Sequence, residues 1–425
     1  MRRRPFRFVP ERPEQDLLSM NFLFVHQNFP GQFRHVAKAL AEMPEHRVVG
    51  IGESANLKGR LSLHPRINVM GYQPKRGASP ETHHYIRDFE GAVRRGQEVA
   101  RVAFELRKKG FRPDLVISHP AWGESFFLPD IFPDARHIGY FEYFYRSSGG
   151  DIGFDPEFPS SFDDRLKVRI KNTTQLLSLD SADAGISPTL WQQSRYPKEF
   201  HSKIRVIHEG VDTNVVAPDE NASIDIDGAH FIRGDRVITY VARNLEPCRG
   251  VHVFIRAIPL IQELCPDARI VIIGGDDVSY GRRPTAGTTY RSLYCDEVKD
   301  VADWSRVHFT GRLPYNRYLK ILQLSSAHVY LTYPFVLSWS MLEAMAAGCV
   351  VIGSATPPVQ EVITHAENGL LVDFFDREEL ARTVAGVVNN QSQHEQIRQS
   401  ARQTILDRYD LHTKCLPELL RYLIG

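Results

Sequence analysis

Two arginines six residues apart are the first side chains in this sequence with an evident chemistry. Arg243 directly follows the apolar run Val237–Ala242, and Arg249 precedes a helical apolar pattern that begins at Val253. A guanidinium group binds phosphate oxygens through paired hydrogen bonds, and each charged bond of this kind contributes about 1.5–3 kcal/mol. Two such groups flanking a strand-to-helix loop can point at one anion. Taken alone, however, such a pair is more often two solvated loop arginines.

A glutamate later in the chain strengthens the anion-site interpretation. Glu343 lies in the segment Met341–Gly348, shortly after the apolar run Ala327–Tyr333, which predicts a buried strand. We expect Glu343 in the first turn of the following helix, where the helix dipole favours a carboxylate and free N–H groups attract anions. There it could accept two hydrogen bonds from a vicinal diol. Strand, loop and helix together predict a polar ligand at the strand ends.

The elements that would position these groups follow an alternating pattern. Apolar runs alternate with longer helical patterns, which predicts parallel sheets with crossover helices. We expect strands at residues 21–26, 46–51, 114–119, 136–141, 184–187, 204–208, 237–242, 269–274, 306–310, 327–332 and 349–353. We expect helices at residues 33–43, 88–109, 164–180, 377–409 and 413–424. The polar stretch 210–235 is the predicted linker, and Asp225 to Asp227 within it are predicted to form a solvated loop.

Length and composition fit two soluble domains. The 425 residues suffice for two cores, and the net charge of +1 gives no general attraction to nucleic acid. Five cysteines without paired spacing favour reduced thiols in the cytoplasm over a disulfide frame or a zinc site. No apolar run reaches the roughly 18–20 residues that cross a bilayer. Residues 1–19 are predicted to be a disordered extension, unless translation begins at Met20.

These motifs make the chain resemble the family-4 glycosyltransferases, which are retaining nucleotide-sugar transferases with two Rossmann-like domains. The family's Gly/Ala-Arg-x5-Lys loop matches at Arg243, with Arg249 in the lysine position, and the last glutamate of its E-x7-E segment matches at Glu343. The resemblance covers nearly everything from Met20 onward and is stronger in the second half. Smaller matches lie at residues 208–213 (HEGVDT), 272–277 (IIGGDD), 309–313 (FTGRL) and 367–372 (ENGLLV).

The resemblance implies an α/β fold of the GT-B type, in which two Rossmann-like domains with parallel sheets face each other across a cleft. Residues 20–212 are then the acceptor domain and residues 213–410 the nucleotide-sugar domain. The C-terminal helix, at about residues 411–425, is expected to pack back on the acceptor domain.

The resemblance also implies roles for single residues. Arg243 and Arg249 would neutralise the diphosphate, and Glu343 would bind the ribose hydroxyls. His119, which ends a predicted strand, would contact the donor sugar and diphosphate. Further donor contacts are expected at Gly31, at Gly311 and Leu313 in the base-recognition turn, and in the sugar-binding loop at Phe335, Val336, Leu337 and Ser338. Because arginines supply the positive charge, neither a metal nor another cofactor is expected.

One position departs from the family pattern. Eight residues before Glu343, where the family has its first glutamate, this chain has Phe335. A phenyl ring cannot accept a hydrogen bond from a sugar hydroxyl. The sugar could be held by backbone groups, the donor could be a deoxy sugar, or the protein could bind without catalysing.

We therefore expect a retaining hexosyl or deoxyhexosyl transferase that moves a sugar from a nucleoside diphosphate sugar to a glycan or lipid-linked acceptor, in polysaccharide, lipopolysaccharide or glycolipid synthesis. Basic residues on the predicted helices 88–109 and 164–180 would allow peripheral contact with an anionic membrane, and the expected location is the cytoplasm at the inner membrane face. The alternatives are a catalytically silent nucleotide-sugar-binding subunit, a sugar-nucleotide epimerase on the same fold, or a glycogen-type phosphorylase.

Overall fold

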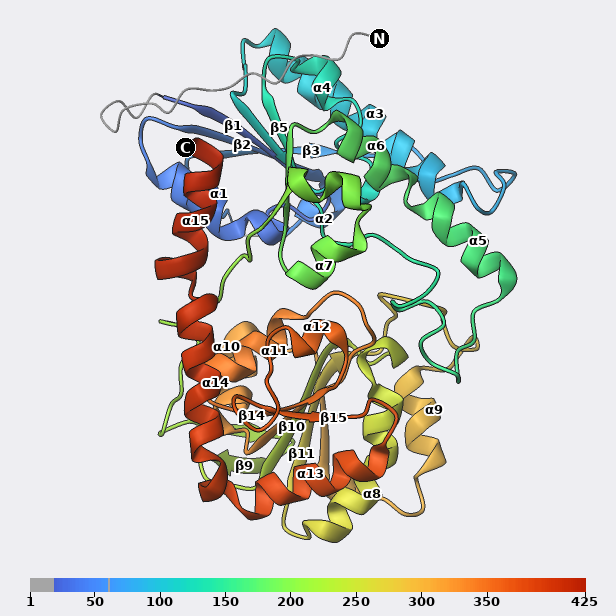
Figure 1. Ribbon diagram of the computed structural model, residues 1–425, viewed down its shortest axis with the longest axis vertical. Coiled ribbons are helices and arrows are strands. Elements are labelled where there is room, and N and C mark those ends of the chain that lie inside the picture. Colours follow the sequence, from blue (N-terminus) through green and yellow to red (C-terminus); the bar gives the residue numbers. More distant parts are fainter. Residues whose placement is uncertain (1–18, 60–61) are drawn as a thin grey trace.

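The computed structural model describes residues 19–59 and 62–425, which form two α/β lobes stacked along the long axis (Figure 1). The predicted N-terminal extension, apart from Ser19, lies outside the described residues.

The first lobe is built on a parallel sheet of seven strands in the order β3-β2-β1-β4-β5-β6-β7. Residues 22–25 of β1 are apolar throughout because both faces of the sheet are covered: Phe22 and Phe24 enter one buried cluster, Leu23 and Val25 another. The strands are β1 (Asn21–Val25), β2 (Arg47–Glu53), β3 (Ile67–Tyr72), β4 (Leu115–Ser118), β5 (Arg136–Tyr140), β6 (Ala184–Ser187) and β7 (Ile204–Val206). The helices are α1 (Arg34–Glu42), α2 (Ser54–Leu57), α3 (Arg87–Lys108), α4 (Leu128–Ile131), α5 (Phe162–Lys171), α6 (Thr173–Ser181) and α7 (Leu190–Arg195).

The second lobe contains a parallel sheet of six strands in the order β12-β11-β10-β13-β14-β15. Its strands are β10 (Val237–Asn244), β11 (Arg269–Gly275), β12 (Val307–Gly311), β13 (Ala327–Tyr330), β14 (Val350–Ser354) and β15 (Leu370–Val372). Its helices are α8 (Val251–Leu264), α9 (Tyr290–Glu297), α10 (Tyr315–Leu324), α11 (Trp339–Ala346), α12 (Pro357–Gln360), α13 (Arg377–Asn389) and α14 (Glu395–Arg408). The strand order places β10 and β13 side by side at the centre, so the loops that follow these two strands are neighbours.

The chain crosses between the lobes more than once. Helix α15 (Leu416–Ile424) follows α14 back to the first lobe, where Figure 1 shows it beside α1. Leu423 is buried there in the cluster that contains Phe22. No helix in residues 19–59 and 62–425 combines the length and the apolar character needed to span a bilayer.

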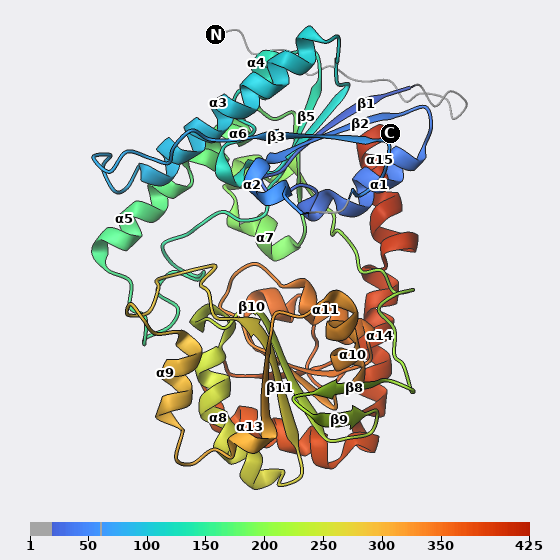
Figure 2. The same cartoon turned by 180° about the vertical axis from the view of Figure 1, so that it is seen from behind.

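The predicted linker contains structure that the sequence interpretation missed. The predicted solvated loop at residues 225–227 is exposed to solvent as expected. It belongs, however, to an antiparallel hairpin of β8 (Ser223–Ile226) and β9 (Ala229–Ile232), seen from behind in Figure 2. Asp227 and Gly228, both with positive φ, form its turn. Alternating apolar residues stabilise the hairpin, because Ile224 and Phe231 pack into a cluster of the second lobe.

Two predicted helices are each divided in two. The predicted helix 164–180 breaks at Asn172, whose side chain accepts the Tyr145 N–H (2.9 Å) and donates to the Tyr145 carbonyl (2.8 Å). The predicted helix 377–409 is α13 and α14, separated at residues 390–394. Both breaks depend on contacts or turns that apolar periodicity does not report.

Candidate functional site

Arg249 is held where the loop after β10 meets the loop after β13. Gly250 adopts φ +71°, and a Cβ atom there would lie 2.4 Å from Leu331, so glycine allows the close approach. Nη1 of Arg249 donates to Thr332 Oγ1 (2.9 Å) and to the Val336 carbonyl (3.0 Å). Its Nε and Nη2 make no hydrogen bond with any described residue. The guanidinium is thus anchored by one nitrogen and offers two others to a ligand.

The positive charges of Arg243 and Arg249 both influence the pKa of Tyr280. Arg243 is exposed near the end of β10 and forms no ion pair or hydrogen bond within the described residues. Burial raises the pKa of Tyr280 to about 12, the charge of Glu142 adds to this, and the charges of Arg249 and Arg243 oppose it. The Arg249 guanidinium lies 6.0 Å from the Tyr280 ring centre. Arg249 thus lies beside Tyr280, and the charges of Arg243 and of Glu142 from the first lobe also influence the Tyr280 hydroxyl.

Glu343 lies in the second turn of α11, not in the first turn as expected, because the helix already begins at Trp339. The dipole argument for its position was therefore wrong. Its carboxylate instead accepts hydrogen bonds from Tyr315 (2.8 Å) and Tyr318 (2.7 Å) on α10. Burial raises the pKa of Glu343, and the two tyrosine hydrogen bonds partly oppose this. Each oxygen retains a lone pair for a further donor.

The predicted sugar-binding loop, residues 335–338, links Arg249 to α11. Phe335 is only 3% exposed and lies edge-on against Tyr143 (4.7 Å) and Tyr280 (4.8 Å). The Ser338 N–H donates to the Tyr330 hydroxyl (2.8 Å), and the Ser338 side chain caps α11. Val336 is half-buried and Leu337 buried. Phe335 thus contributes apolar packing between the lobes, and polar contacts from this loop would come from its backbone and Ser338.

His119 follows β4 and lies at the end of the first sheet that faces the second lobe. It is fully buried and stacks on Trp122, with ring centres 4.6 Å apart. Its Nδ1 accepts the Ala121 N–H (3.4 Å), so its proton is on Nε2, which lies 3.5 Å from Glu142 Oε2. That distance is long for a hydrogen bond, and Nε2 has no hydrogen-bond partner among the described residues.

Glu142 is a candidate site residue that the sequence interpretation did not single out. The loop after β5 carries it, and Gln32 donates to its Oε1 (2.9 Å). Burial raises the pKa of Glu142, but contacts with His119 and Gln32 and the charge of Arg249 outweigh this, so that the net shift is downward. Glu142 is therefore an anionic group beside His119 that also feels the charge of Arg249 in the other lobe. Its only signal in the sequence was being the one acid in the aromatic loop 140–145.

The predicted glycine contacts have different surroundings. Gly31 adopts φ +50°, and a Cβ atom there would lie 2.5 Å from the His26 ring, so a side chain does not fit. Gly311 adopts φ +65° in open space, and Leu313 nearby is half-buried. Arg312 between them donates to Asn244 Oδ1 (2.7 Å), which places the Gly311 turn beside the end of β10. Gly31 belongs to the first lobe and Gly311 to the second.

Solved structures with the same architecture cover nearly the whole chain. Sucrose-phosphate synthase from Thermosynechococcus elongatus aligns with a TM-score of 0.72 at 16% identity and covers 95% of this chain and 98% of its own. Anabaena HepE in complex with UDP and glucose aligns with a TM-score of 0.67 at 15% identity. The alignment covers 95% of this chain and 99% of the HepE chain. Identities this low report the fold, and the predicted GT-B architecture is confirmed.

Two family profiles account for most of the sequence. The Glycosyl transferase family 4 group matches residues 44–216, and the Glycosyl transferases group 1 matches residues 224–404. The chain belongs to the family-4 type of GT-B glycosyltransferases. The resemblance read from the Arg243, Arg249 and Glu343 motifs is thereby confirmed.

Curated relatives within the glycosyltransferases match part of the chain. The D-inositol 3-phosphate glycosyltransferase of Mycobacteroides abscessus is 25% identical over 52% of this chain and 43% of its own. A GDP-mannose-dependent alpha-(1-6)-phosphatidylinositol monomannoside mannosyltransferase of Mycolicibacterium smegmatis is 23% identical over 55% of this chain and 60% of its own. The chain thus spans between about two fifths and three fifths of these two relatives.

Glu209, in the segment that joins the two domains, is a second carboxyl that the sequence did not single out. Tyr140, at the end of β5, donates a hydrogen bond to its Oε1. Its Oε2 lies 3.6 Å from His208 Nε2 and has no hydrogen-bond partner among the described residues. Burial raises the pKa of Glu209 to about 7.

Replacing Glu209 with glutamine should remove a pH dependence of stability. The folded-state pKa of about 7 exceeds the ordinary value of 4.5, so the unfolded chain releases this proton first as pH rises. The stability due to the proton is present below about pH 4.5 and is lost by pH 7, a change of roughly 3 kcal/mol. We expect Glu209→Gln to unfold with a higher free energy than the wild type at pH 8. The two proteins should converge towards pH 4.5.

Denaturant titrations of both proteins between pH 4.5 and 8 check this expectation. Burial lowers the pKa of the neighbouring His208 to about 4, which destabilises the fold as pH falls below about 6.5. That effect is common to both proteins and cancels in their difference. Parallel stability profiles across this range would show that Glu209 keeps an ordinary pKa.

Proposed function

We propose that this protein transfers a sugar, with retention of anomeric configuration, from a nucleoside diphosphate sugar to an acceptor hydroxyl. The observation that carries the proposal is the anchored guanidinium of Arg249, with Arg243 exposed near the end of β10, before the same loop. The charge of Arg249 helps to lower the pKa of Glu142 in the other domain, where Glu142 lies 3.5 Å from His119. A site of this kind places fixed positive charge where a diphosphate would leave. It places a histidine and a carboxylate where a sugar and an acceptor would lie.

The residues suggest how the reaction would proceed. As the glycosidic bond breaks, negative charge grows on the diphosphate oxygens, and the unoccupied Nε and Nη2 of Arg249 would stabilise it. Glu343 would hold the ribose and so orient the leaving group. The acceptor would attack from the side on which the diphosphate leaves, and a phosphate oxygen would take the acceptor proton. In this scheme the arginines replace a metal ion.

The comparisons support a nucleotide-sugar donor but leave its sugar a proposal. HepE, which shares the fold, is described in complexes with UDP, with UDP and glucose, and with UDP-glucose. Two curated relatives are named for transfer to inositol phosphate or phosphatidylinositol mannoside. For this chain we propose a hexosyl or deoxyhexosyl donor and a glycan or lipid-linked acceptor, as in polysaccharide, lipopolysaccharide or glycolipid synthesis.

Helices α5 and α6 support peripheral contact with an anionic membrane. Phe162 is 70% exposed, and the apolar Leu166, Leu176 and Leu177 are exposed on the same pair of helices. Basic residues of α5 lie among them: Arg165, Lys167, Arg169 and Lys171. Apolar and basic side chains together suit an interface with acidic headgroups. We propose that the protein works in the cytoplasm, at the inner face of the membrane.

A panel of nucleotide sugars tests the proposal. UDP-, GDP-, ADP- and dTDP-sugars are added to the full-length protein, the shift in melting temperature is measured, and donor hydrolysis is followed with the best ligand. We expect one nucleotide class to raise the melting temperature and its sugar to be released slowly. If none shifts the melting temperature and Arg243→Ala leaves any activity intact, the donor-site assignment is wrong.

A catalytically silent binding subunit is the second candidate, and the burial of Phe335 is the observation that favours it. An apolar ring at this position removes a hydrogen-bond acceptor for the sugar. This candidate predicts a thermal shift with a nucleotide sugar but neither hydrolysis nor transfer to any acceptor. If the wild type releases sugar from the donor and a variant without Arg249 does not, a catalytically silent subunit is excluded.

A further inference from the structure

A segment of the first domain reaches across to the second domain and contacts it closely. We call residues 150–160, between β5 and α5, the interdomain strap. Figure 1 shows this part of the chain leaving the first lobe and running down towards the ends of α8 and α9. The chain connection at residues 207–212 and helix α15 also cross between the lobes, so the strap is a further crossing.

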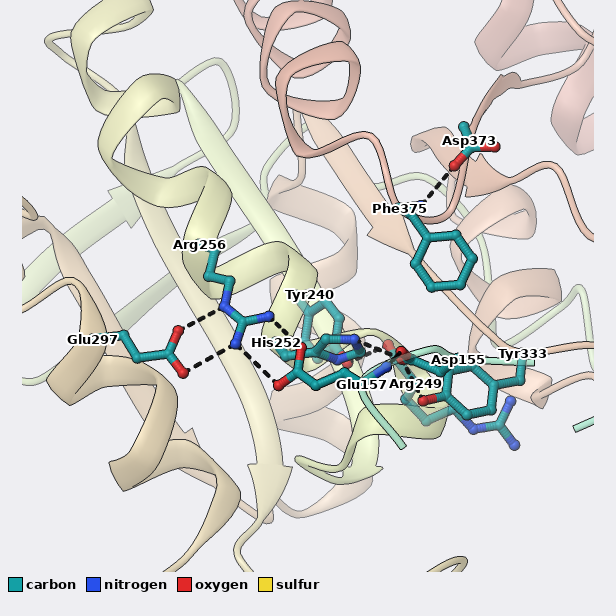
Figure 3. Close-up of polar contacts among 10 residues, drawn as sticks. All are labelled: Asp155, Glu157, Tyr240, Arg249, His252, Arg256, Glu297, Tyr333, Asp373 and Phe375. Carbon is teal, nitrogen blue, oxygen red and sulfur yellow. Dashed lines mark hydrogen bonds and ion pairs between the residues drawn. The ribbon is translucent and has the colours of Figure 1, made fainter. Parts of the chain in front are cut away.

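The strap places a buried carboxylate inside the second domain. Asp155 is 3% exposed, and its Oδ2 lies 2.9 Å from His252 Nε2 and accepts a hydrogen bond from the Tyr333 hydroxyl (2.6 Å), as Figure 3 shows. Its Oδ1 accepts the Glu157 N–H (2.8 Å). Nδ1 of His252 has no partner among the described residues, so the ring is held in place through Asp155. A buried carboxylate with this many partners is costly to remove.

Aromatic packing and an ion pair hold the strap on either side of Asp155. Phe154 packs on Tyr333, with ring centres 5.1 Å apart, and Phe158 contacts the edge of His252 (5.9 Å). Glu157 accepts two hydrogen bonds from Arg256 (2.6 and 3.0 Å), which also binds Glu297. Glu157 and Arg256 lie nearer the surface, whereas Asp155 is enclosed.

The two partners of Asp155 belong to the two segments that hold Arg249. His252 lies in the first turn of α8, three residues after Arg249. Tyr333 precedes the loop 335–338, and its N–H donates to the Cys248 carbonyl (2.9 Å) in the turn that carries Arg249. Arg249 itself donates to Thr332 and Val336, on either side of Tyr333. One carboxylate from the first domain thus contacts both segments of the second domain that hold Arg249.

We propose that Asp155 is a positioning residue of the donor site, which fixes Arg249 and the loop 335–338 in their anion-binding arrangement only while the strap is docked. That the ligand is a nucleotide sugar rests on the proposed function. That Arg249 binds an anion does not depend on it. A consequence of this role of Asp155 is that the acceptor domain takes part in building the diphosphate site of the other domain. Donor affinity and domain contact are then linked, because both require the same carboxylate.

Asp155→Asn and Asp155→Ala test the proposal in the full-length protein, with inorganic pyrophosphate as the probe. Glu157→Gln is the matched control, because it weakens the surface anchor of the same strap without touching His252 or Tyr333. We expect Asp155→Asn to weaken pyrophosphate binding by about tenfold and Asp155→Ala to weaken it more, since misplaced groups cost up to ~10²-fold. Glu157→Gln should bind as the wild type does. Backbone hydrogen exchange should rise at residues 247–252 and 332–338 in the Asp155 variants alone.

The result that overturns the proposal is unchanged pyrophosphate affinity and unchanged exchange at residues 332–338 in Asp155→Asn. A role in stability only would lower the melting temperature of Asp155 and Glu157 variants without separating their pyrophosphate affinities, and it would equally overturn the proposal. If the Asp155 variants fail to fold, Tyr333→Phe decides, because it removes only the hydroxyl that reaches Asp155. Pyrophosphate and exchange need no sugar transfer, so a failed nucleotide-sugar panel with the expected exchange pattern would refute the proposed function alone.

Discussion

Replacing Arg249 with alanine should lower the turnover number of sugar transfer by about 10²–10³-fold, the usual cost of losing one preorganised group that stabilises developing charge. The expectation follows from the position of the guanidinium. Nη1 is fixed by Thr332 and Val336, so Nε and Nη2 are already oriented when the ligand arrives. The measurement is steady-state kinetics with the donor that the nucleotide-sugar panel selects.

Two further arginine variants make the Arg249 result specific. Arg249→Lys keeps the charge but loses the planar fork, so its turnover should lie between those of the wild type and the alanine variant. Arg382 is exposed on α13 and pairs with Glu378 (3.3 Å), and Arg382→Ala should leave turnover unchanged. Circular dichroism and melting temperature check that each variant is folded. Turnover in a folded Arg249→Ala variant within a few-fold of the wild type would contradict the proposed charge stabilisation.

Replacing Glu343 with glutamine should weaken binding of the nucleoside diphosphate by roughly 10–150-fold, which corresponds to about 1.5–3 kcal/mol for a hydrogen bond to a charged group. The carboxylate already accepts from Tyr315 and Tyr318, and each of its oxygens has a lone pair left for a ligand hydroxyl. An amide has only one acceptor oxygen and would compete poorly for a ribose diol. Isothermal titration with the diphosphate measures the change.

Tyr315→Phe is the control for the Glu343 variant. It removes one of the two hydroxyls at the carboxylate but keeps the charge, so affinity should change by a few-fold at most. The two predictions also differ in kind: Arg249 should affect turnover more than ground-state binding, whereas Glu343 should affect binding. Equal nucleotide affinity of Glu343→Gln and the wild type would exclude a role for Glu343 at the ribose.

The buried strands and the residues that follow them show what sequence patterns can predict. The buried strands β1, β4, β10 and β13 were recognised because residues covered on both faces of a parallel sheet are mostly apolar. In such a sheet all carboxyl ends lie on one edge, so His119 and Arg243, each following a strand, were expected at the ligand-binding edges of their sheets. Strand β3, the hairpin and the short helices lacked so clear a pattern and were missed.

Local pattern alone could not place Glu343 or Phe335. Glu343 was expected in the first turn of its helix, but Ser338 caps the helix one turn earlier than the sequence suggested. Phe335 was recognised as a departure from the family pattern with several possible consequences, and its surroundings were unknown. The structure buries its ring against Tyr143 of the other domain, a contact between residues almost two hundred positions apart.

The sequence by itself determined the two parallel-sheet domains, the family and the three charged residues of its motifs, because periodicity and motif spacing are local properties of the chain. Only the tertiary structure decided that Glu142 lies beside His119, and that Asp155 contacts both segments that hold Arg249. Both acids sit on irregular loops, whose courses are fixed by packing within the first domain and against the second. Such packing depends on side chains brought together from distant parts of the chain, which no local pattern encodes.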